Sequence, residues 1–348
     1  MLTPDALGRL QRCSIAVDLA TDRVRVHLKD GGLLVDVPTT IALHRSHRDA
    51  LAFGERAEQM VGREPDHIEV VRPIVGGMVV DVDLAQRLLR YAVGGQMRWA
   101  RLRTPLLRAA LALPYDSPPV ACRSAVETLY GIGVRRVELV DTLMAAAIGS
   151  GLPVQHPEAS MIVLTGADTT QIAVLSMGSV VASETVPVGS DAFGRSIAEY
   201  FRVRHGVALT QQSVHGLLKV FESEGGAPKF GWEVDGRDLA SGLARTVRAD
   251  PDSVREATTT PLSEVLAGVG EVLRNCAPDL VVDIADRGIM LAGSVTRLPG
   301  LDTLLREATG LPVHTAERPD ECVARGMGLM IEGKGPDLAV TGGQLLWR

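Results

Sequence analysis

Two stretches of the chain repeat one pattern of short apolar runs separated by turn residues. The runs lie at residues 15–17, 24–28 and 33–37, and again at residues 161–164, 171–175 and 180–182. In both stretches the order is strand, Thr-containing turn, strand, glycine turn, strand. Two copies of one three-strand unit, each opening half of the chain, predict a duplicated domain whose turns face a common cleft.

Helices are predicted where apolar residues recur at spacings of three and four. Residues 262–273 carry one such stripe, and residues 83–93 repeat the pattern. Residues 144–149 are rich in alanine, and we expect a helix whose small side chains permit close packing. The segment 223–236 is rich in Gly, Pro and charge and is predicted to be a surface loop. Residues 333–348 are expected to form a mobile tail.

Length and composition narrow the class of protein. A chain of 348 residues is too long for one compact core, so two domains are expected. The formal net charge of −6 argues against nucleic acid as a partner. The sequence contains neither a signal peptide nor a run of about 20 apolar residues, and we expect a cytoplasmic protein. The cysteines are far apart and predict buried, reduced thiols, whereas His44, His47 and His67 lack ligand spacing and are expected to be exposed.

The segment from Leu164 to Thr170 is the first candidate for chemistry. Between two predicted strands it reads Leu-Thr-Gly-Ala-Asp-Thr-Thr, a turn whose backbone N–H groups and hydroxyls can point at a polyphosphate. Such a site needs an acid at the end of the first strand to hold a metal or order water. Leu164 cannot do this, so nucleotide-dependent chemistry is in doubt.

Several stretches then give the chain a family resemblance. The stretches are Gly54 to Ala57 with Met60 to Arg63, Arg72-Pro73 with Val79 to Asp81, Met144 to Pro153, Gly236 to Leu239 with Gly242-Leu243, Asp283 to Gly288, and Thr309 to Val313. In this order, over residues 14–332, they resemble the MreB (rod-shape-determining) family of bacterial actins. The resemblance implies an α/β actin-like ATPase fold, with duplicated ribonuclease-H-like domains that each carry a smaller inserted subdomain.

The resemblance also implies the domain boundaries. Domain I is expected at residues 13–143, with its small subdomain at about 33–75. Domain II is expected at residues 144–332, with its small subdomain at about 184–256 and its end packing back toward domain I.

The two phosphate hairpins depart from the family pattern. The first normally reads Asp-Leu-Gly-Thr-Ala-Asn-Thr, of which Asp18 and Thr21 remain while Asp22 adds negative charge that Arg23 offsets. The second normally reads Asp-Ile-Gly-Gly-Gly-Thr-Thr-Glu. Here Leu164, Ala167 and Asp168 replace an acid and two glycines, whereas Gly166, Thr169 and Thr170 match.

Other positions of the nucleotide site are altered as well. Thr142-Leu143 replaces the Glu-Pro that carries the family's water-polarising glutamate, and the Lys-x-Glu pair falls at His215 and Leu217. Gly293-Ser294-Val295 replaces a triple glycine, and β-branched Val295 disfavours a positive φ. The candidate nucleotide contacts that remain are Asp18, Thr21, Gly166, Thr169, Thr170, Gly293 and Ser294. We assign no catalytic residue and no metal ligand. The resemblance implies ATP with Mg²⁺ as the cofactor, but efficient turnover is not expected, since removing one preorganised group commonly costs on the order of 10²–10³ in rate.

A basic and apolar segment at 94–103 predicts contact with a membrane. Met97, Trp99 and Leu102 alternate with Arg98, Arg101 and Arg103, and family members carry a membrane-touching loop near this position. The equally weighted alternative is a helix end whose Trp99 covers the domain core.

The leading hypothesis is a divergent MreB-like cytoskeletal protein with ATP hydrolysis weak or lost. It would assemble with itself or with a more typical MreB-type relative, and would contact membrane-bound cell-wall synthesis proteins at the inner face of the membrane. One alternative is an active ATPase that uses Asp18, Asp168 and Thr169 as altered ligands. Another is a sugar kinase or chaperone of the same superfamily, which the lack of a carbohydrate-site acid and of a peptide-binding domain disfavours.

Overall fold

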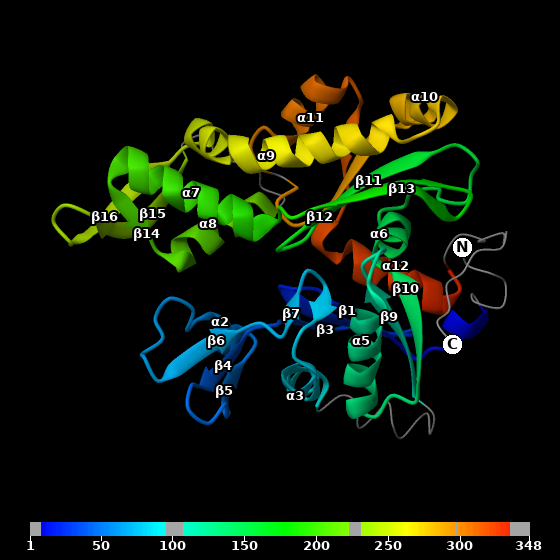
Figure 1. The fold of residues 1–348 in the computed structure, drawn as a ribbon, viewed down its shortest axis with the longest axis horizontal. Coiled ribbons are helices and arrows are strands. Elements are labelled where there is room, and N and C mark those ends of the chain that lie inside the picture. Colours follow the sequence, from blue (N-terminus) through cyan, green and yellow to red (C-terminus); the bar gives the residue numbers. More distant parts are fainter. Residues whose placement is uncertain (1–7, 95–106, 223–230, 297, 335–348) are drawn as a thin grey trace. The chain divides into compact units, whose positions relative to one another are not determined.

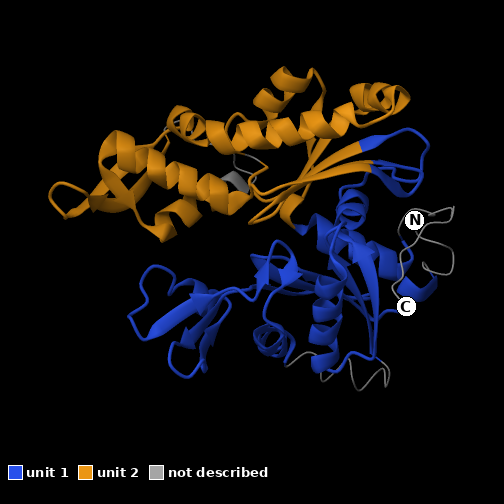
Figure 2. Cartoon of the chain, viewed as in Figure 1, with its two compact units in different colours: residues 1–160, 175–181, 321–348 blue, residues 161–174, 182–320 orange. Residues whose placement is uncertain are grey.

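A computed structural model describes residues 8–94, 107–222, 231–296 and 298–334. The chain divides into two compact units, coloured separately in Figure 2. Unit 1 comprises residues 1–160, 175–181 and 321–348, and unit 2 comprises residues 161–174 and 182–320. Residues 144–160, which the expected boundary assigns to the second domain, thus cluster with unit 1. The boundaries of the two actin-like domains stay a prediction.

Unit 1 is built on a five-stranded sheet in the order β10-β9-β1-β2-β3 (Figure 1). β1, β2 and β3 form an antiparallel meander, and β9 and β10 continue it in parallel from β1. Its described elements are β1 (Ile15–Leu19), β2 (Arg23–Leu28), β3 (Gly32–Pro38), β4 (Ile41–His44), β5 (Ala50–Phe53), α2 (Glu55–Glu58), β6 (Ile68–Val71), β7 (Ile74–Val75), β8 (Met78–Val79), α3 (Val82–Val93), β9 (Arg108–Leu113), α5 (Pro119–Gly131), β10 (Arg136–Asp141), α6 (Thr142–Gly149) and α12 (Cys322–Glu332).

Helix α3 confirms the helix predicted at residues 83–93. The Asp81 carboxylate caps it by accepting a hydrogen bond from Leu84 N at 3.0 Å. Its apolar stripe, with Leu84, Leu88 and Leu89, is buried in the aliphatic core of unit 1. The spacing of the stripe is therefore what anchors this helix to the sheet.

Helices α6 and α12 pack against each other inside unit 1 at very short range. A Cβ atom added at Gly149 would lie 1.9 Å from the carbonyl oxygen of Cys322, and one at Gly326 would lie 1.8 Å from that of Ala145. The predicted close packing of the alanine-rich helix is thus confirmed, and glycine on both helices makes it possible.

The second half of the chain repeats the topology of the first. Its sheet has the order β13-β12-β11-β17-β18, which matches β3-β2-β1-β9-β10 strand for strand. Its elements are β11 (Ser160–Thr165), β12 (Thr170–Ser176), β13 (Ser179–Val186), α7 (Ser190–His205), β14 (Val207–Leu209), α8 (Gln211–Glu222), β15 (Trp232–Asp238), β16 (Ala244–Ala249), α9 (Pro251–Arg274), α10 (Pro278–Arg287), β17 (Ile289–Gly293), α11 (Leu301–Thr309), β18 (Val313–Thr315) and the 3-10 helix η1 (Pro319–Glu321). The repeated strand order confirms the duplication predicted from the sequence.

Each half also carries a small three-stranded sheet, with the orders β5-β4-β6 and β14-β15-β16. The second of these corrects the surface loop predicted at residues 223–236, because residues 232–236 belong to strand β15. Val234 and Gly236 are buried while their neighbours are exposed, as expected of a strand with one covered face. The glycine and charge content of the segment hid this alternation. Residues 223–230 lie outside the described part of the chain.

Helix α9 is longer than the predicted helix at residues 262–273. It begins at Pro251, and the Asp250 carboxylate caps it by accepting from Ser253 N at 2.7 Å. Pro261 lies inside it and is buried. Since proline usually ends a helix, its presence hid the first half of α9 from the sequence pattern.

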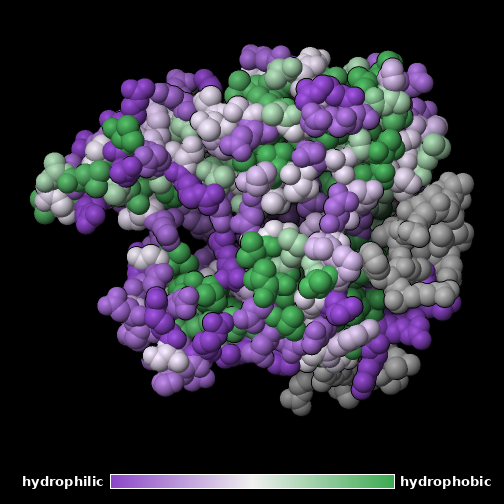
Figure 3. Space-filling view, in the orientation of Figure 1, coloured by the Kyte–Doolittle hydropathy of each residue, from purple (hydrophilic) through white to green (hydrophobic). Residues whose placement is uncertain are grey.

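The surface mixes hydrophilic and hydrophobic residues (Figure 3). On the face shown there, hydrophobic residues gather over the β7–β8 hairpin, where Val75 and Val80 are exposed. Among the described residues, no helix combines the length and hydropathy that a bilayer crossing requires.

Candidate functional site

The turn between β1 and β2 in unit 1 is held by hydrogen bonds from two other segments. Its ends are closed by a hydrogen bond from Ala20 N to Arg23 O at 3.1 Å. Thr39 donates to the carbonyl oxygens of both Thr21 and Asp22, the first through its hydroxyl and the second through its N–H. Gly77 N donates to the Thr21 hydroxyl oxygen at 3.2 Å, which leaves the hydroxyl hydrogen able to bind an acceptor. The turn is therefore preformed.

Asp18 is the next-to-last residue of β1, and only Leu19 separates it from this turn. It is only 6% exposed, and burial raises the pKa of its carboxyl to about 6. The positive charge of Arg25 opposes that rise in pKa, while the negative charges of Asp22 and Asp36 add to it. Arg25 lies directly opposite Asp18 in the β1–β2 register. The carboxylate thus already has a cationic partner within the fold.

The turn between β11 and β12 in unit 2 is held by the start of α7. Gly166 N donates to Thr169 O at 2.8 Å and closes the turn. The carbonyl oxygens of Gly166 and Ala167 accept from Ser190 N at 2.9 Å and Asp191 N at 3.0 Å. Asp191 therefore lies in the first turn of α7, whose N-cap is Gly189.

Three of the predicted nucleotide contacts in unit 2 brace this turn. The Thr170 hydroxyl is buried and donates to Val188 O at 2.6 Å. The Ser294 hydroxyl lies 3.1 Å from the carbonyl oxygens of Thr165 and Gly166. Gly293 has a φ of +86°, and a Cβ atom there would lie 2.0 Å from Thr165 O. These residues shape the turn, and Gly166 and Thr169 stand within it.

Val295 follows this glycine in a conformation that the sequence disfavours. Its φ is +52° although it is β-branched, and its side chain is only 1% exposed. A β-branched residue in the left-handed region is strained, so its burial has to hold it there.

Three more positions at which the chain departs from the family pattern lie in unit 2. Leu164 is buried at the end of β11, where the family has an acid. Leu217 is buried on α8 and His215 is exposed on the same helix. The burial of Leu217 fits packing of unit 2 rather than contact with a nucleoside.

Two charged residues of unit 1 were not predicted from the sequence as candidate site residues. One is Arg25, which stands out in the sequence only as a charged residue within an apolar strand. Asp141 is the other: it ends β10 and caps α6, accepting from Leu143 N at 2.7 Å. Burial raises the pKa of Asp141 to about 6, against the lowering effect of backbone hydrogen bonds from Leu143 and Met144. An acid just before the alanine-rich helix was the available signal.

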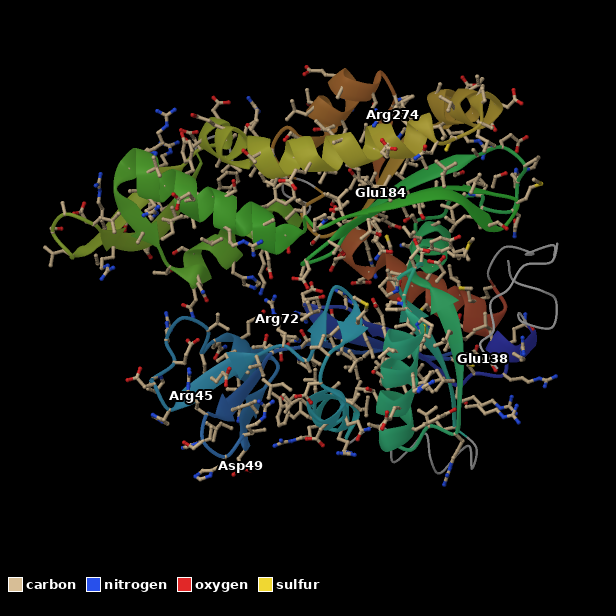
Figure 4. The ribbon with its side chains drawn as sticks, viewed as in Figure 1. Arg45, Asp49, Arg72, Glu138, Glu184 and Arg274 are labelled. Carbon is tan, nitrogen blue, oxygen red and sulfur yellow. The ribbon has the colours of Figure 1, made fainter. Side chains whose placement is uncertain are left out.

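The three histidines of unit 1 are closer together than their spacing suggested. The His44 ring stacks on His47 at 5.1 Å between centroids and lies 5.8 Å from His67. His47 and His67 are exposed, as predicted, whereas His44 is half-buried. Arg45 and Asp49, labelled in Figure 4, lie with His47 in the β4–β5 connection, whereas His44 ends β4 and His67 precedes β6. No group of side chains in the described ranges is arranged to hold a metal ion.

The two turns differ in the ligand groups that their residues can bind. The preformed β1–β2 turn, with the Thr21 hydroxyl, fits a phosphate. The two positions at which the family has an acid offer little to a divalent cation, because Asp18 faces Arg25 and Leu164 has no charge to offer. The predicted membrane contacts Met97, Trp99 and Leu102 lie outside the described residues.

Comparisons with known proteins agree over most of the chain. The model of the family described as MreB/Mbl protein matches residues 12–336. The cell shape-determining protein MreB of Escherichia coli strain K12 is 34% identical over 323 residues, covering 91% of this chain and 93% of that protein. The cell shape-determining protein Mbl of Bacillus subtilis strain 168 is 31% identical over 319 residues, covering 91% and 95%.

Solved structures give the same result for the fold. The crystal structure of MreB5 of Spiroplasma citri bound to ADP has a TM-score of 0.81 at 25% identity, covering 90% of this chain and 94% of that one. The same protein bound to AMPPNP has a TM-score of 0.82 with the same coverage. The predicted actin-like fold is confirmed.

Proposed function

The chain belongs to the MreB/Mbl family, and from this premise we propose that it is a bacterial actin-like cytoskeletal protein that takes part in determining cell shape. The observation that carries the proposal is the match of the family model to residues 12–336, together with the strand order repeated in both halves. Both named relatives are cell shape-determining proteins that align over nearly their whole length.

We propose that the protein acts by self-association. Actin-like subunits stack head to tail, and a heterologous contact of this kind propagates as a filament. The second form of the proposal is co-assembly with a more typical MreB-type relative. In either form the assembly would lie on the cytoplasmic face of the membrane and contact membrane-bound cell-wall synthesis proteins.

We further propose that ATP binds and that its hydrolysis is weak or lost. The preformed β1–β2 turn supports binding, as does the binding of ADP and AMPPNP by a structural relative. Leu164 at the acid position and Thr142 at the glutamate position support loss of turnover. The alternative is an active, filament-forming ATPase with altered ligands, among which Asp18, Asp168 and Thr169 are the candidates.

Sedimentation tests the assembly proposal. The purified full chain, alone and mixed with a typical MreB relative, is centrifuged at increasing concentration with ATP. We expect the chain to pellet above a critical concentration, alone or only in the mixture, and to return to the supernatant on dilution. A chain that stays monomeric and leaves the relative's pelleting unchanged would contradict the proposal.

Phosphate release in the same samples tests the proposed loss of hydrolysis. We expect a rate on the order of 10² below that of the typical relative, because preorganised electrostatic groups are missing. An equal rate would favour the active ATPase.

A further inference from the structure

A row of alternating charges crosses β1, β2 and β3 beside the first phosphate turn. Asp18 pairs with Arg25 in the β1–β2 register, and Arg25 pairs with Asp36 in the β2–β3 register. Directly opposite residues of neighbouring strands project on the same face of a sheet. The order on this face is therefore acid, base, acid.

Arg25 is the central charge of this row. It is 4% exposed, and an arginine does not lose its proton in a protein. Its Nε lies 3.4 Å from Asp36 Oδ1. The buried positive charge is thus permanent and is held between two carboxylates.

Asp36 is shared with a second cation. Arg23 Nε lies 2.5 Å from Asp36 Oδ1, and Arg23 Nη2 donates to Asp36 O at 3.0 Å. Arg23 also lies 3.7 Å from Glu55. Because Arg23 also pairs with Asp36, Arg25 does not balance Asp36 alone, and its charge also acts on Asp18, which lies opposite it in the register.

A hydrated divalent cation would meet this fixed positive charge at Asp18. Mg²⁺ is usually bound by one or two carboxylates together with phosphate oxygens in octahedral geometry. Of the two acids at the first turn, Asp18 faces Arg25 and Asp22 is followed directly by Arg23. The repulsion between Mg²⁺ and Arg25 is strong because a buried site has a low effective dielectric constant. The residues present therefore do not fit the divalent cation that the family resemblance implies.

We propose that Arg25 is the resident counter-cation of the first phosphate turn, so that this chain binds a nucleoside triphosphate there without needing a divalent cation. The inference rests on the proposed nucleotide binding and concerns its dependence on metal. A guanidinium suits this role because it stays charged when buried and is less strongly hydrated than an ammonium.

Calorimetric titration of the full wild-type chain with ATP tests the inference. One titration contains EDTA and the other contains Mg²⁺ at the same ionic strength. We expect the two dissociation constants to agree within about threefold, a difference well below 1.4 kcal/mol. Binding that is more than about tenfold weaker in EDTA would overturn the inference. Absence of ATP binding in both titrations would also overturn the inference. The proposed assembly is tested separately, by sedimentation.

Variants of Arg25 make the test specific. Arg25→Leu removes the charge and exposes Asp18 to metal, so ATP binding in EDTA should weaken by about tenfold and Mg²⁺ should restore it. Arg25→Lys keeps the charge and should keep binding independent of metal. Arg136→Leu removes an equal charge from the far end of the same sheet, on β10, and should leave both titrations unchanged.

Thermal melting followed by circular dichroism shows whether each variant folds. If Arg25→Leu does not fold, the wild type and Arg25→Lys decide the question without it. Metal-dependent binding by Arg25→Lys, with the wild type independent of metal, would overturn the role of charge. An unchanged, metal-independent affinity in a folded Arg25→Leu variant would overturn the inference outright.

Discussion

At the scale of single residues, the first phosphate turn is governed by buried charge. Asp18 and Asp141 both end parallel strands of the same sheet, and burial raises the pKa of each to about 6. They differ in what stabilises the carboxylate. Asp18 faces Arg25, whereas Asp141 accepts backbone hydrogen bonds at the start of α6. The acid at the end of β10 is therefore used to begin a helix.

Asp141→Asn should change how stability depends on pH. The pKa of Asp141 is raised in the folded chain from 3.8 to about 6, so the folded chain binds this proton more tightly than the unfolded chain. The contribution of Asp141 to the free energy of unfolding is therefore highest below pH 4 and falls as the pH rises to 6. Asparagine still caps α6 but carries no charge. Relative to the wild type, the variant should gain stability between pH 4 and pH 7, by at most about 3 kcal/mol.

Urea unfolding of both proteins at pH 4 and pH 7 measures this difference. Asp83→Asn, at an exposed aspartate in the first turn of α3, is the matched control and should show a much smaller change with pH. A stability difference between Asp141→Asn and the wild type that is the same at both pH values would contradict the assignment.

At the scale of elements, glycine decides how closely α6 and α12 approach. The two helices pack with Gly149 against the backbone of Cys322 and with Gly326 against the backbone of Ala145. The obstructing atoms are backbone carbonyls, which cannot rotate away as a long side chain can. The C-terminal helix is further tied to β2 by the contact of His27 with Glu332 at 3.1 Å. This packing is what joins residues 321–334 to unit 1.

Gly326→Ala should therefore be strongly destabilising even though alanine is the better helix former. The added methyl would lie 1.8 Å from the Ala145 carbonyl oxygen, so the helices must separate. We expect a loss of about 3 kcal/mol or more, or failure to fold, since overpacking of a tight core typically costs 1–3 kcal/mol.

Gly216→Ala on α8 is the matched control, because no atom lies within 4 Å of a Cβ added there. It should stabilise the chain by about 0.5–1 kcal/mol through helix propensity alone. Thermal and urea unfolding of the two variants measures the contrast. Equal effects of the two substitutions would show that α6 and α12 are not in close contact.

At the scale of the whole molecule, the proposed function depends on contacts that the protein makes with copies of itself and with the membrane. A single subunit contains one copy of the segment at 94–103, whereas the proposed filament would contain many. Basic residues near an anionic membrane contribute about 1 kcal/mol each, so one copy attaches weakly. Many linked copies attach firmly because each bound copy raises the effective concentration of the next.

The full chain should therefore co-sediment with vesicles of anionic phospholipid, more weakly at high salt. Trp99→Ala should reduce the bound fraction several-fold without changing the melting temperature. Vesicles of neutral phospholipid are the control and should bind little. If Trp99 instead covers the domain core, the variant should lower the melting temperature and leave vesicle binding unchanged.

Features that depend on neighbouring residues could be predicted from the amino-acid sequence. The repeated run of strand, turn and strand predicted both central meanders, and the stripe at 83–93 predicted α3. The motifs predicted the family and the actin-like fold, and Leu164 marked the missing acid. The sequence pattern failed where a residue typical of loops or helix ends lies inside a regular element. Glycine and charged residues led us to predict a loop where β15 lies, and Pro261 led us to miss the first half of α9.

The side chains that meet across strands and helices could be identified from the fold but not from the sequence. Register brings Arg25 opposite Asp18, and the folding of β4 against β6 gathers His44, His47 and His67. The hydroxyls of Thr170 and Ser294, predicted to contact a nucleotide, were found to brace the second turn. Such contacts join residues that are distant in the chain, so no local pattern encodes them. They follow from the pairing of strands and from burial, which makes a hydrogen-bond or ionic partner favourable for a charge or hydroxyl.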